Sequence, residues 1–303
     1  VYWSMNYDGT VKDDFKHSYC QAFFIYALSS YYRASGDKNA LKLAYEIMDL
    51  VEKYATDDVA YLETMARDWK SELQNDELSE NGLMADKTMN TTLHLMEAYT
   101  ELYLADHSPK VLDRLKFQLD LTYDKIYDKE GHKLLVFFDR NMDVIGDIHS
   151  YGHDIEATWL IDRACEVIGD PAITAKFAEM NKAIVKNIAD IAYDKASGSL
   201  LNERDKDKIN TWRIWWVQAE TVIGFMNAYQ KHYGGKEYFE ISSSVWKFIQ
   251  EHIIDKRPGG EWHSQIDDNW KPADFKPMVD PWKCPYHNGR MCMEMMRRLA
   301  ENA

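Results

Sequence analysis

The sequence predicts an all-α fold. Apolar residues recur at helical spacing along most of its 303 residues, whereas the alternating patterns typical of strands are short and few. Short breaks such as Ser35-Gly36-Asp37 and Gly169-Asp170-Pro171 join the helices in pairs. The two members of a pair also differ, one being apolar on most sides and the other on a single stripe. Alternating buried and surface helices favour a ring of inner and outer helices, an α/α barrel.

Nine helices account for this periodicity, and Pro171 suits the first turn of one of them, where its missing N–H is not needed. We place them at residues 17–34, 37–57, 87–106, 108–124, 153–169, 171–193, 214–233, 235–253 and 286–301. A ring of twelve helices needs three more, so we expect its first three helices to lie outside this sequence. Residues 1–303 are therefore interpreted as a single catalytic domain that is N-terminally incomplete.

The first helix of each pair is expected to be the inner one. Gln21–Leu28 and Val222–Met226 are apolar or aromatic on most sides, which is typical of buried helices. Leu41–Met48, in a second helix, carries one apolar stripe and is expected to cover the outside. The links between pairs predict short β-hairpins, and Tyr127–Gly131 recurs one residue longer at Tyr193–Gly198, which indicates a structural repeat.

Composition argues against several classes of protein. The net charge of −14 disfavours binding to nucleic acid or to a membrane surface, and no run of eighteen apolar residues predicts a transmembrane helix. The four cysteines form no CxxC pair and no zinc-binding spacing, so we interpret them as isolated thiols in a reducing, cytoplasmic compartment. We expect a monomer.

Two histidines at predicted helix starts are the strongest candidates for chemistry. His153 follows the Gly152 break, and His287 follows Pro285. The positive end of a helix dipole favours neutral imidazole, which is a competent general base near pH 7. Two such groups across one pocket suit the transfer of a proton on and off carbon. Glu156 lies three residues after His153, on the same helix face, where it can bind a substrate hydroxyl or hold an imidazole.

Structural interpretations of the same residues stay open. Glu156 could belong to an ordinary capping turn, and His287 could be a structural histidine. His94 lies four residues after Asn90, on the same helix face. It can be a core histidine whose hydrogen bonds are satisfied, or it can point into a central pocket. His94 and Glu97 also have a His-x-x-Glu spacing, but Gly152 breaks the helix between His149 and His153, and we expect no metal.

Aromatic residues are abundant, with ten tryptophans and nineteen tyrosines. They can fill the core, or they can stack on the apolar faces of sugar rings. Of the pair Trp215 and Trp216, we expect one to pack and the other to face the pocket. Most of the remaining histidines are interpreted as surface or loop residues: His17, His107, His132, His149, His232, His252 and His263.

Four strings of residues, in this order, resemble the N-acylglucosamine 2-epimerase superfamily, and within it most closely the cellobiose 2-epimerases. The strings are Lys87–Tyr99, Tyr151–Trp159, Trp215–Glu220 and Trp282–Arg290. Tyr2-Trp3 and Tyr19–Phe23 also fit, so the resemblance spans nearly the whole chain.

The resemblance implies an (α/α)6 barrel and an isomerase that needs no cofactor. The implied reaction is reversible epimerisation at C2 of the reducing-end glucose of β-1,4-linked disaccharides, from cellobiose to glucosyl-mannose and from lactose to epilactose. It implies that His153 and His287 are the acid/base residues and that His94 assists ring opening. The residues implied to line the site are Glu156, Asn90, Glu220, Tyr19, Trp216 and Trp282. The superfamily also uses an arginine from its N-terminal helices.

Three alternatives remain. The first is an N-acylglucosamine 2-epimerase or an aldose–ketose isomerase on the same barrel, for which Trp216 and Trp282 would matter less than for a disaccharide. The second is a catalytically silent glycan-binding barrel. The third is a hydrolase with two acidic residues across a glycosidic bond, which the abundance of carboxylates leaves open.

Overall fold

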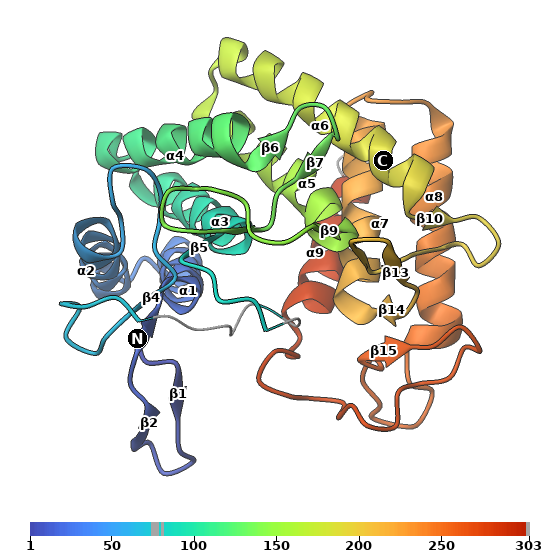
Figure 1. Cartoon of the computed structure of the whole chain (residues 1–303), viewed down its shortest axis with the longest axis horizontal. Coiled ribbons are helices and arrows are strands. Elements are labelled where there is room, and N and C mark those ends of the chain that lie inside the picture. Colours follow the sequence, from blue (N-terminus) through green and yellow to red (C-terminus); the bar gives the residue numbers. More distant parts are fainter. Residues whose placement is uncertain (74–78, 80–81, 301–303) are drawn as a thin grey trace. The chain divides into compact units, whose positions relative to one another are not determined.

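The computed structural model describes residues 1–73, 79 and 82–300, and in this part of the chain it contains nine α-helices (Figure 1). They are α1 (Ser18–Ser35), α2 (Lys38–Tyr54), α3 (Met89–Asp106), α4 (Pro109–Leu121), α5 (Tyr151–Ile168), α6 (Pro171–Ile191), α7 (Trp215–Gln230), α8 (Lys236–Phe248) and α9 (Tyr286–Ala300). Single π-helical turns, Thr122–Ile126 and Ile249–Ile253, extend α4 and α8. Each helix lies within a few residues of its predicted range, so the all-α class is confirmed.

The strands are short, and four of their pairings connect the two ends of a helix pair. They are β1 (Ser4–Met5), β2 (Val11–Asp13), β3 (Lys16–His17), β4 (Thr64–Met65), β5 (Lys87–Thr88), β6 (Tyr127–Asp128), β7 (Lys133–Leu134), β8 (Phe137–Phe138), β9 (Ile148–Ser150), β10 (Tyr193–Asp194), β11 (Ser199–Leu200), β12 (Glu203–Asp205), β13 (Lys208–Asn210), β14 (Arg213–Ile214) and β15 (Gln265–Ile266). The strand before each of α1, α3, α5 and α7 pairs with a strand in the segment between the next helix and the following helix pair: β3 with β4, β5 with β8, β9 with β12 and β14 with β15. All four pairings are antiparallel.

The same backbone hydrogen bond anchors the start of each of these helices. The first residue of the helix donates its N–H to the carbonyl just before the returning strand: Ser18 to Glu63, Met89 to Val136, Tyr151 to Asn202 and Trp215 to Ser264, at 2.8 to 3.3 Å. The predicted repeat is therefore confirmed, and its element is a helix pair closed by two strands. The repeated Tyr-Asp pairs are β6 and β10, which form hairpins with β7 and β11.

Burial follows the predicted order for three of the first helices. In α3, α5 and α7 most residues are buried, whereas α2, α6 and α8 bury one face. The prediction for α1 is wrong among the described residues. Ala22 and Ile25 of α1 are buried on the side that packs against α2 and α3, but Phe24 and Tyr31 on another side are 40% and 56% exposed.

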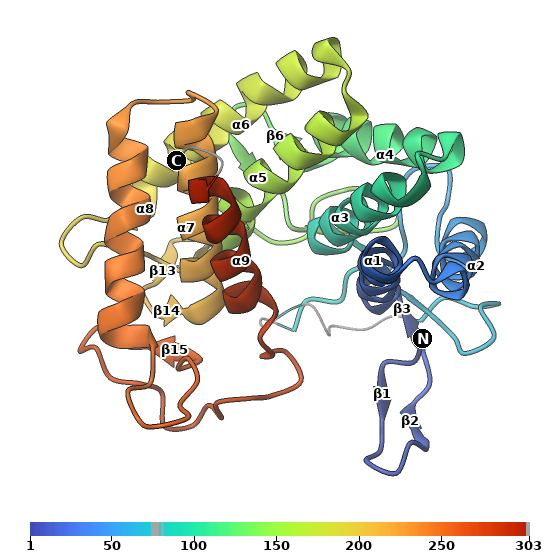
Figure 2. The same cartoon turned by 180° about the vertical axis from the view of Figure 1, so that it is seen from behind.

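The chain divides into two compact units. Unit 1 consists of residues 1–129, 134–146 and 163–174, and unit 2 of residues 130–133, 147–162 and 175–303. In unit 1, α1 lies beside α2 and α3. In unit 2, α7 lies beside α8 on one side, and Figure 2 shows α9, in red, against α7. No helix in the described part of the chain is both long and apolar enough to cross a membrane.

Two glycines let α5 approach α7 within unit 2. A Cβ atom on Gly224 of α7 would lie 2.7 Å from the backbone oxygen of Ile155, and one on Gly152 of α5 would lie 2.7 Å from the ring of Trp216. Real Cβ atoms do not come so close. The side chain of Trp216 therefore lies over the first turn of α5 because residue 152 has no side chain.

We predict that Gly224→Ala lowers the free energy of unfolding by about 1–3 kcal/mol, because the added methyl group overpacks the crossing of α5 and α7. The measurement is urea denaturation followed by circular dichroism. Gly289→Ala is the matched control, since Gly289 lies in α9 with nothing within 4 Å of its Cβ position. That variant should be neutral or more stable by up to about 1 kcal/mol, because alanine favours the helix. Equal losses in both variants would contradict the close crossing.

Candidate active site

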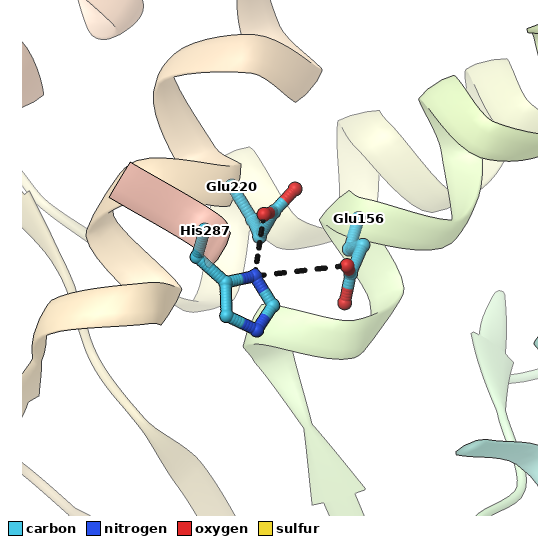
Figure 3. A group of neighbouring side chains, drawn as sticks. All are labelled: Glu156, Glu220 and His287. Atoms are coloured by element: carbon cyan, nitrogen blue, oxygen red, sulfur yellow. Dashed lines mark hydrogen bonds and ion pairs between the residues drawn. The ribbon is translucent and has the colours of Figure 1, made fainter. Parts of the chain in front are cut away.

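Two buried carboxylates and an imidazole meet in unit 2. Figure 3 shows Glu156 of α5, Glu220 of α7 and His287 of α9 pointing toward one another. The Nδ1 atom of His287 lies 2.7 Å from Oε1 of Glu220 and 3.9 Å from Oε1 of Glu156. Both carboxylates are fully buried. Buried carboxylates so close together need a compensating positive charge.

Arg290, one turn after His287 on α9, supplies that charge. Its Nη2 atom donates to Oε1 of Glu156 and to Oε1 of Glu220, at 2.7 Å in each case. Its guanidinium lies over the rings of Trp159 and Tyr286, at 4.8 and 4.3 Å from their centroids. These aromatic faces shield the ion pairs from water and add cation–π attraction.

The environment of Glu220 keeps it ionised. Burial raises the pKa of Glu220, but the charge of Arg290 and the hydrogen bond and charge of His287 lower it by more, so the pKa lies well below its usual range. The other oxygen, Oε2, accepts a hydrogen bond from the indole N–H of Trp159 at 3.0 Å. Glu220 is therefore a carboxylate at neutral pH and accepts, rather than donates, every hydrogen bond that it makes.

This state of Glu220 determines how His287 is protonated. An ionised carboxylate 2.7 Å from Nδ1 requires that Nδ1 carry the hydrogen. The lone pair of neutral His287 is then on Nε2, which Figure 3 shows on the side of the ring away from Glu220. A histidine with its tautomer held by a carboxylate is the usual arrangement of a general base.

Glu261, a loop residue, contacts residues before and after His287 in the chain. Glu261 accepts a hydrogen bond from Nδ2 of Asn288 at 2.5 Å and forms an ion pair with the buried side chain of Lys283. Lys283 also bonds the carbonyl of Met278 at 2.7 Å. The start of α9, which carries His287, is thus fastened both to the loop that precedes it and to the loop between α8 and β15.

His153 and His287 both contact the ring of Trp216. The ring of Trp216 is 4.7 Å from the ring of His153 and 5.5 Å from that of His287, measured between centroids. Trp216 is half-buried, whereas Trp215 is 5% exposed and packs edge-on against His287. Trp215 therefore packs, as predicted, whereas Trp216 is more accessible and contacts both imidazoles. That Trp216 faces a pocket stays a prediction. The Nδ1 atom of His153 is 2.7 Å from the hydroxyl of Ser150.

The same three side chains could in principle hold a metal. One ligand atom from each of Glu156, Glu220 and His287 lies within 4.8 Å of the others. Arg290 already binds the oxygens that would face an ion, at 2.7 Å, and balances their charge. A divalent cation would have to displace a buried guanidinium, so the donor set does not fit a resident metal. The expectation of no metal stays a prediction.

The other candidate residues lie in unit 1 or on a loop. His94 of α3 is buried, with Nδ1 3.0 Å from Oε2 of Glu97, and its ring is 5.2 Å from that of Tyr19 and 5.0 Å from that of Phe23. Asn90 lies one turn earlier on α3. Trp282, in the loop before α9, is 47% exposed. The roles of Tyr19, Asn90, His94 and Trp282 toward a sugar stay predictions.

The interpretation of His17 and His149 as surface or loop residues is wrong. His149 of β9 is buried, with Nε2 2.6 Å from Oδ2 of Asp154. His17 of β3 is also buried and caps α1 by accepting the N–H of Tyr19 at 3.3 Å, and burial lowers its pKa to about 4. Strands of two or three residues are too short to show an alternating pattern, so no periodicity indicated that these two histidines are buried.

Two functional contacts were missed from sequence. Arg290 was included only as the last residue of the string Trp282–Arg290, without a role, and Ser150 was not singled out. The signal for Arg290 was its place three residues after His287, on the same helix face. Ser150 is the last residue before α5, and nothing in the sequence distinguishes its hydroxyl from that of a helix cap.

Comparisons with known proteins agree on one family. The family model described as N-acylglucosamine 2-epimerase (GlcNAc 2-epimerase) matches residues 1–287. A cellobiose 2-epimerase of Ruminococcus albus is 57% identical over 298 residues, which cover 98% of this chain and 76% of that protein. The crystal structure of a sugar epimerase from a ruminal bacterium, 56% identical, superposes with a TM-score of 0.95 over 98% of this chain and 76% of that one. The structure of the cellobiose 2-epimerase of Bacillus thermoamylovorans B4167, 40% identical, gives 0.92 over the same shares. The fold is therefore the one that the sequence motifs predicted.

We predict that Arg290→Met lowers the free energy of unfolding by about 3–5 kcal/mol at pH 8, because it leaves two buried carboxylates without their cation. The loss should be smaller at pH 5. In the variant, burial raises the pKa of these carboxylates above the unfolded value, so stability is lost as pH rises from the unfolded pKa through the raised folded pKa. Urea denaturation at both pH values measures this.

Arg297→Met is the control for Arg290→Met. Arg297 is exposed and pairs with Glu294 on the surface of α9, so its loss should cost less than about 0.5 kcal/mol at either pH. A loss for Arg290→Met as small as that of the control, or one independent of pH, would contradict the assigned role of Arg290.

Proposed function

Because the chain belongs to the N-acylglucosamine 2-epimerase family, we propose that it interconverts β-1,4-linked disaccharides by epimerising C2 of the reducing-end glucose. The enzyme is an isomerase. Cellobiose would become glucosyl-mannose, and lactose would become epilactose. The observation that carries the proposal is that the imidazoles of His153 and His287 both contact the ring of Trp216.

The reaction begins with opening of the pyranose ring, which exposes an aldehyde at C1. The aldehyde acidifies the C2–H bond. One imidazole takes the proton from C2 with its unprotonated ring nitrogen. The electrons of the C2–H bond form a C1–C2 double bond, and the carbonyl electrons move onto O1. The product of this step is an enediolate, which hydrogen-bond donors in the pocket stabilise.

The second histidine, which enters the cycle as imidazolium, then donates its proton to C2 on the opposite face, and C2 is inverted. Proton exchange with solvent restores the starting protonation of both rings. A single base would tend to return the proton to the face from which it came, so two bases are the simplest way to invert the centre. In the reverse direction the two histidines exchange roles. The reaction moves only a proton and needs no external oxidant or reductant, which is consistent with a cofactor-independent enzyme.

The buried charges prepare His287 for both roles. Ionised Glu220 keeps the hydrogen on Nδ1, so Nε2 can accept a proton, and the resulting imidazolium is stabilised by the same carboxylate. Arg290, itself held by Glu156, keeps Glu220 in this state. The face of Trp216 offers an apolar surface on which a sugar ring can stack.

We predict that, in heavy water, the glucosyl-mannose formed from cellobiose carries deuterium at C2, because the proton is exchanged at the imidazoles. Product NMR with cellobiose, lactose, mannose and N-acetylglucosamine side by side reads both the label and the substrate class. Turnover of the two disaccharides far above that of the monosaccharides supports the proposal. Turnover of N-acetylglucosamine or mannose alone would show that the substrates are monosaccharides rather than disaccharides. A product without solvent deuterium would overturn the two-base scheme.

Single substitutions in the same assay test whether His153 and His287 each take part in the reaction. His153→Ala and His287→Ala should each lose at least about a hundredfold in kcat, the usual contribution of a positioned acid or base. His252→Ala is the control, since His252 lies in the π-helical turn after α8 and contacts Trp270 and Phe248 instead. Near-normal turnover in either site variant would remove that histidine from the reaction.

A further inference from the structure

The hydroxyl of Ser150 touches the imidazole of His153 and no role has been assigned to it. Ser150 ends β9, where it pairs with Glu203 of β12, and its side chain is nearly buried. Its Oγ atom is 2.7 Å from Nδ1 of His153, three residues on in the first turn of α5. The strand pairing and the N–H···O bond from Tyr151 to Asn202 fix this serine relative to the helix.

Comparison with the equivalent position of the repeat shows that the contact of Ser150 differs from an ordinary helix cap. Thr88 occupies the equivalent place before α3, and its hydroxyl accepts the backbone N–H of Thr91, three residues on, at 3.0 Å. Ser150 also reaches the residue three positions on, but its hydroxyl bonds the side chain of that residue. At the start of α5, the hydroxyl at the capping position therefore bonds an imidazole instead of a backbone N–H.

We propose that Ser150 is a positioning residue for His153, and that it makes the two imidazoles of the site chemically unequal; this inference rests on the proposed function. Glu220 can only accept a hydrogen bond, so it allows one neutral tautomer of His287, with the hydrogen on Nδ1. The hydroxyl of Ser150 can accept from Nδ1–H or donate to a bare Nδ1, so it supports both neutral tautomers of His153.

This difference has a consequence for proton transfer. With the hydrogen on Nδ1, neutral His153 presents a lone pair on Nε2 and acts as a base. With the hydroxyl donating to Nδ1, neutral His153 carries its hydrogen on Nε2 and can hydrogen-bond an oxygen of the substrate. His287, held by a carboxylate, can donate from Nε2 only as imidazolium. Ser150 therefore gives His153 a second state that His287 lacks.

Nitrogen-15 NMR of histidine-labelled protein tests the tautomers without substrate, with the His153 signals assigned by comparison with His153→Gln. We expect the two ring nitrogens of neutral His153 to resonate between the positions of protonated and bare nitrogen, because both tautomers are populated. Ser150→Asp should move Nδ1 to the protonated position and Nε2 to the bare position, as an acceptor-only partner demands. Ser150→Thr, which keeps a hydroxyl, should leave the signals near those of the native protein.

Kinetics with cellobiose give the second readout. Ser150→Ala should lower kcat by about tenfold, part of the hundredfold or more that a positioned base supplies, while KM changes little. Ser150→Thr should restore most of kcat. Ser242→Ala is the matched control, because it removes a buried hydroxyl of unit 2 that bonds the carbonyl of Val222 in α7.

The outcomes separate this inference from the proposed function. Unchanged nitrogen signals in both Ser150→Ala and Ser150→Asp would overturn the positioning role, as would a folded Ser150→Ala variant with native kcat. A native protein that epimerises none of the tested sugars would overturn the proposed function, while the NMR comparison would still report whether Ser150 sets the tautomer of His153.

Discussion

The guanidinium of Arg290 between Glu156 and Glu220 is the interaction on which the site depends. Two fully buried carboxylates cost several kcal/mol each to desolvate, and they stay ionised only if a cation and hydrogen-bond donors surround them. Arg290 bonds both, and Trp159 and Tyr286 cover it. Because Glu220 is ionised, His287 must hold its hydrogen on Nδ1, which leaves Nε2 for chemistry. The charge of one arginine thus determines the state of an imidazole two contacts away.

The repeat places the candidate residues at matching positions of successive helices. Each pair of helices is closed by two short strands, and the same N–H···O bond starts the first helix of each. Residues proposed for the site recur at the same helix positions. Asn90 and Trp216 are the second residues of α3 and α7, and His94, Glu156 and Glu220 are the sixth residues of α3, α5 and α7. The backbone fixes where each helix begins, and the identity of a few residues in the first two turns decides the chemistry.

The sequence was sufficient for some of this and not for the rest. Helical periodicity predicted the nine helices, and His153 and His287 were found because each follows a glycine or proline break. The burial of α1 was wrong because an apolar pattern does not say which faces have neighbours. The burial of His17 and His149 was missed because β3 and β9 are too short to show a period. The link from Arg290 to Glu156 spans 134 positions, and no local pattern reports such a contact.

The protonation state of His287 tests this chain of causes most directly. Nitrogen-15 NMR of histidine-labelled protein, with the signals assigned by comparison with His287→Gln, distinguishes a protonated from a bare ring nitrogen. The account predicts a protonated Nδ1 and a bare Nε2 in the neutral ring, and loss of that preference in Glu220→Leu. A bare Nδ1 with the hydrogen on Nε2 in the native protein would contradict it, because an ionised Glu220 at 2.7 Å cannot face a nitrogen lone pair.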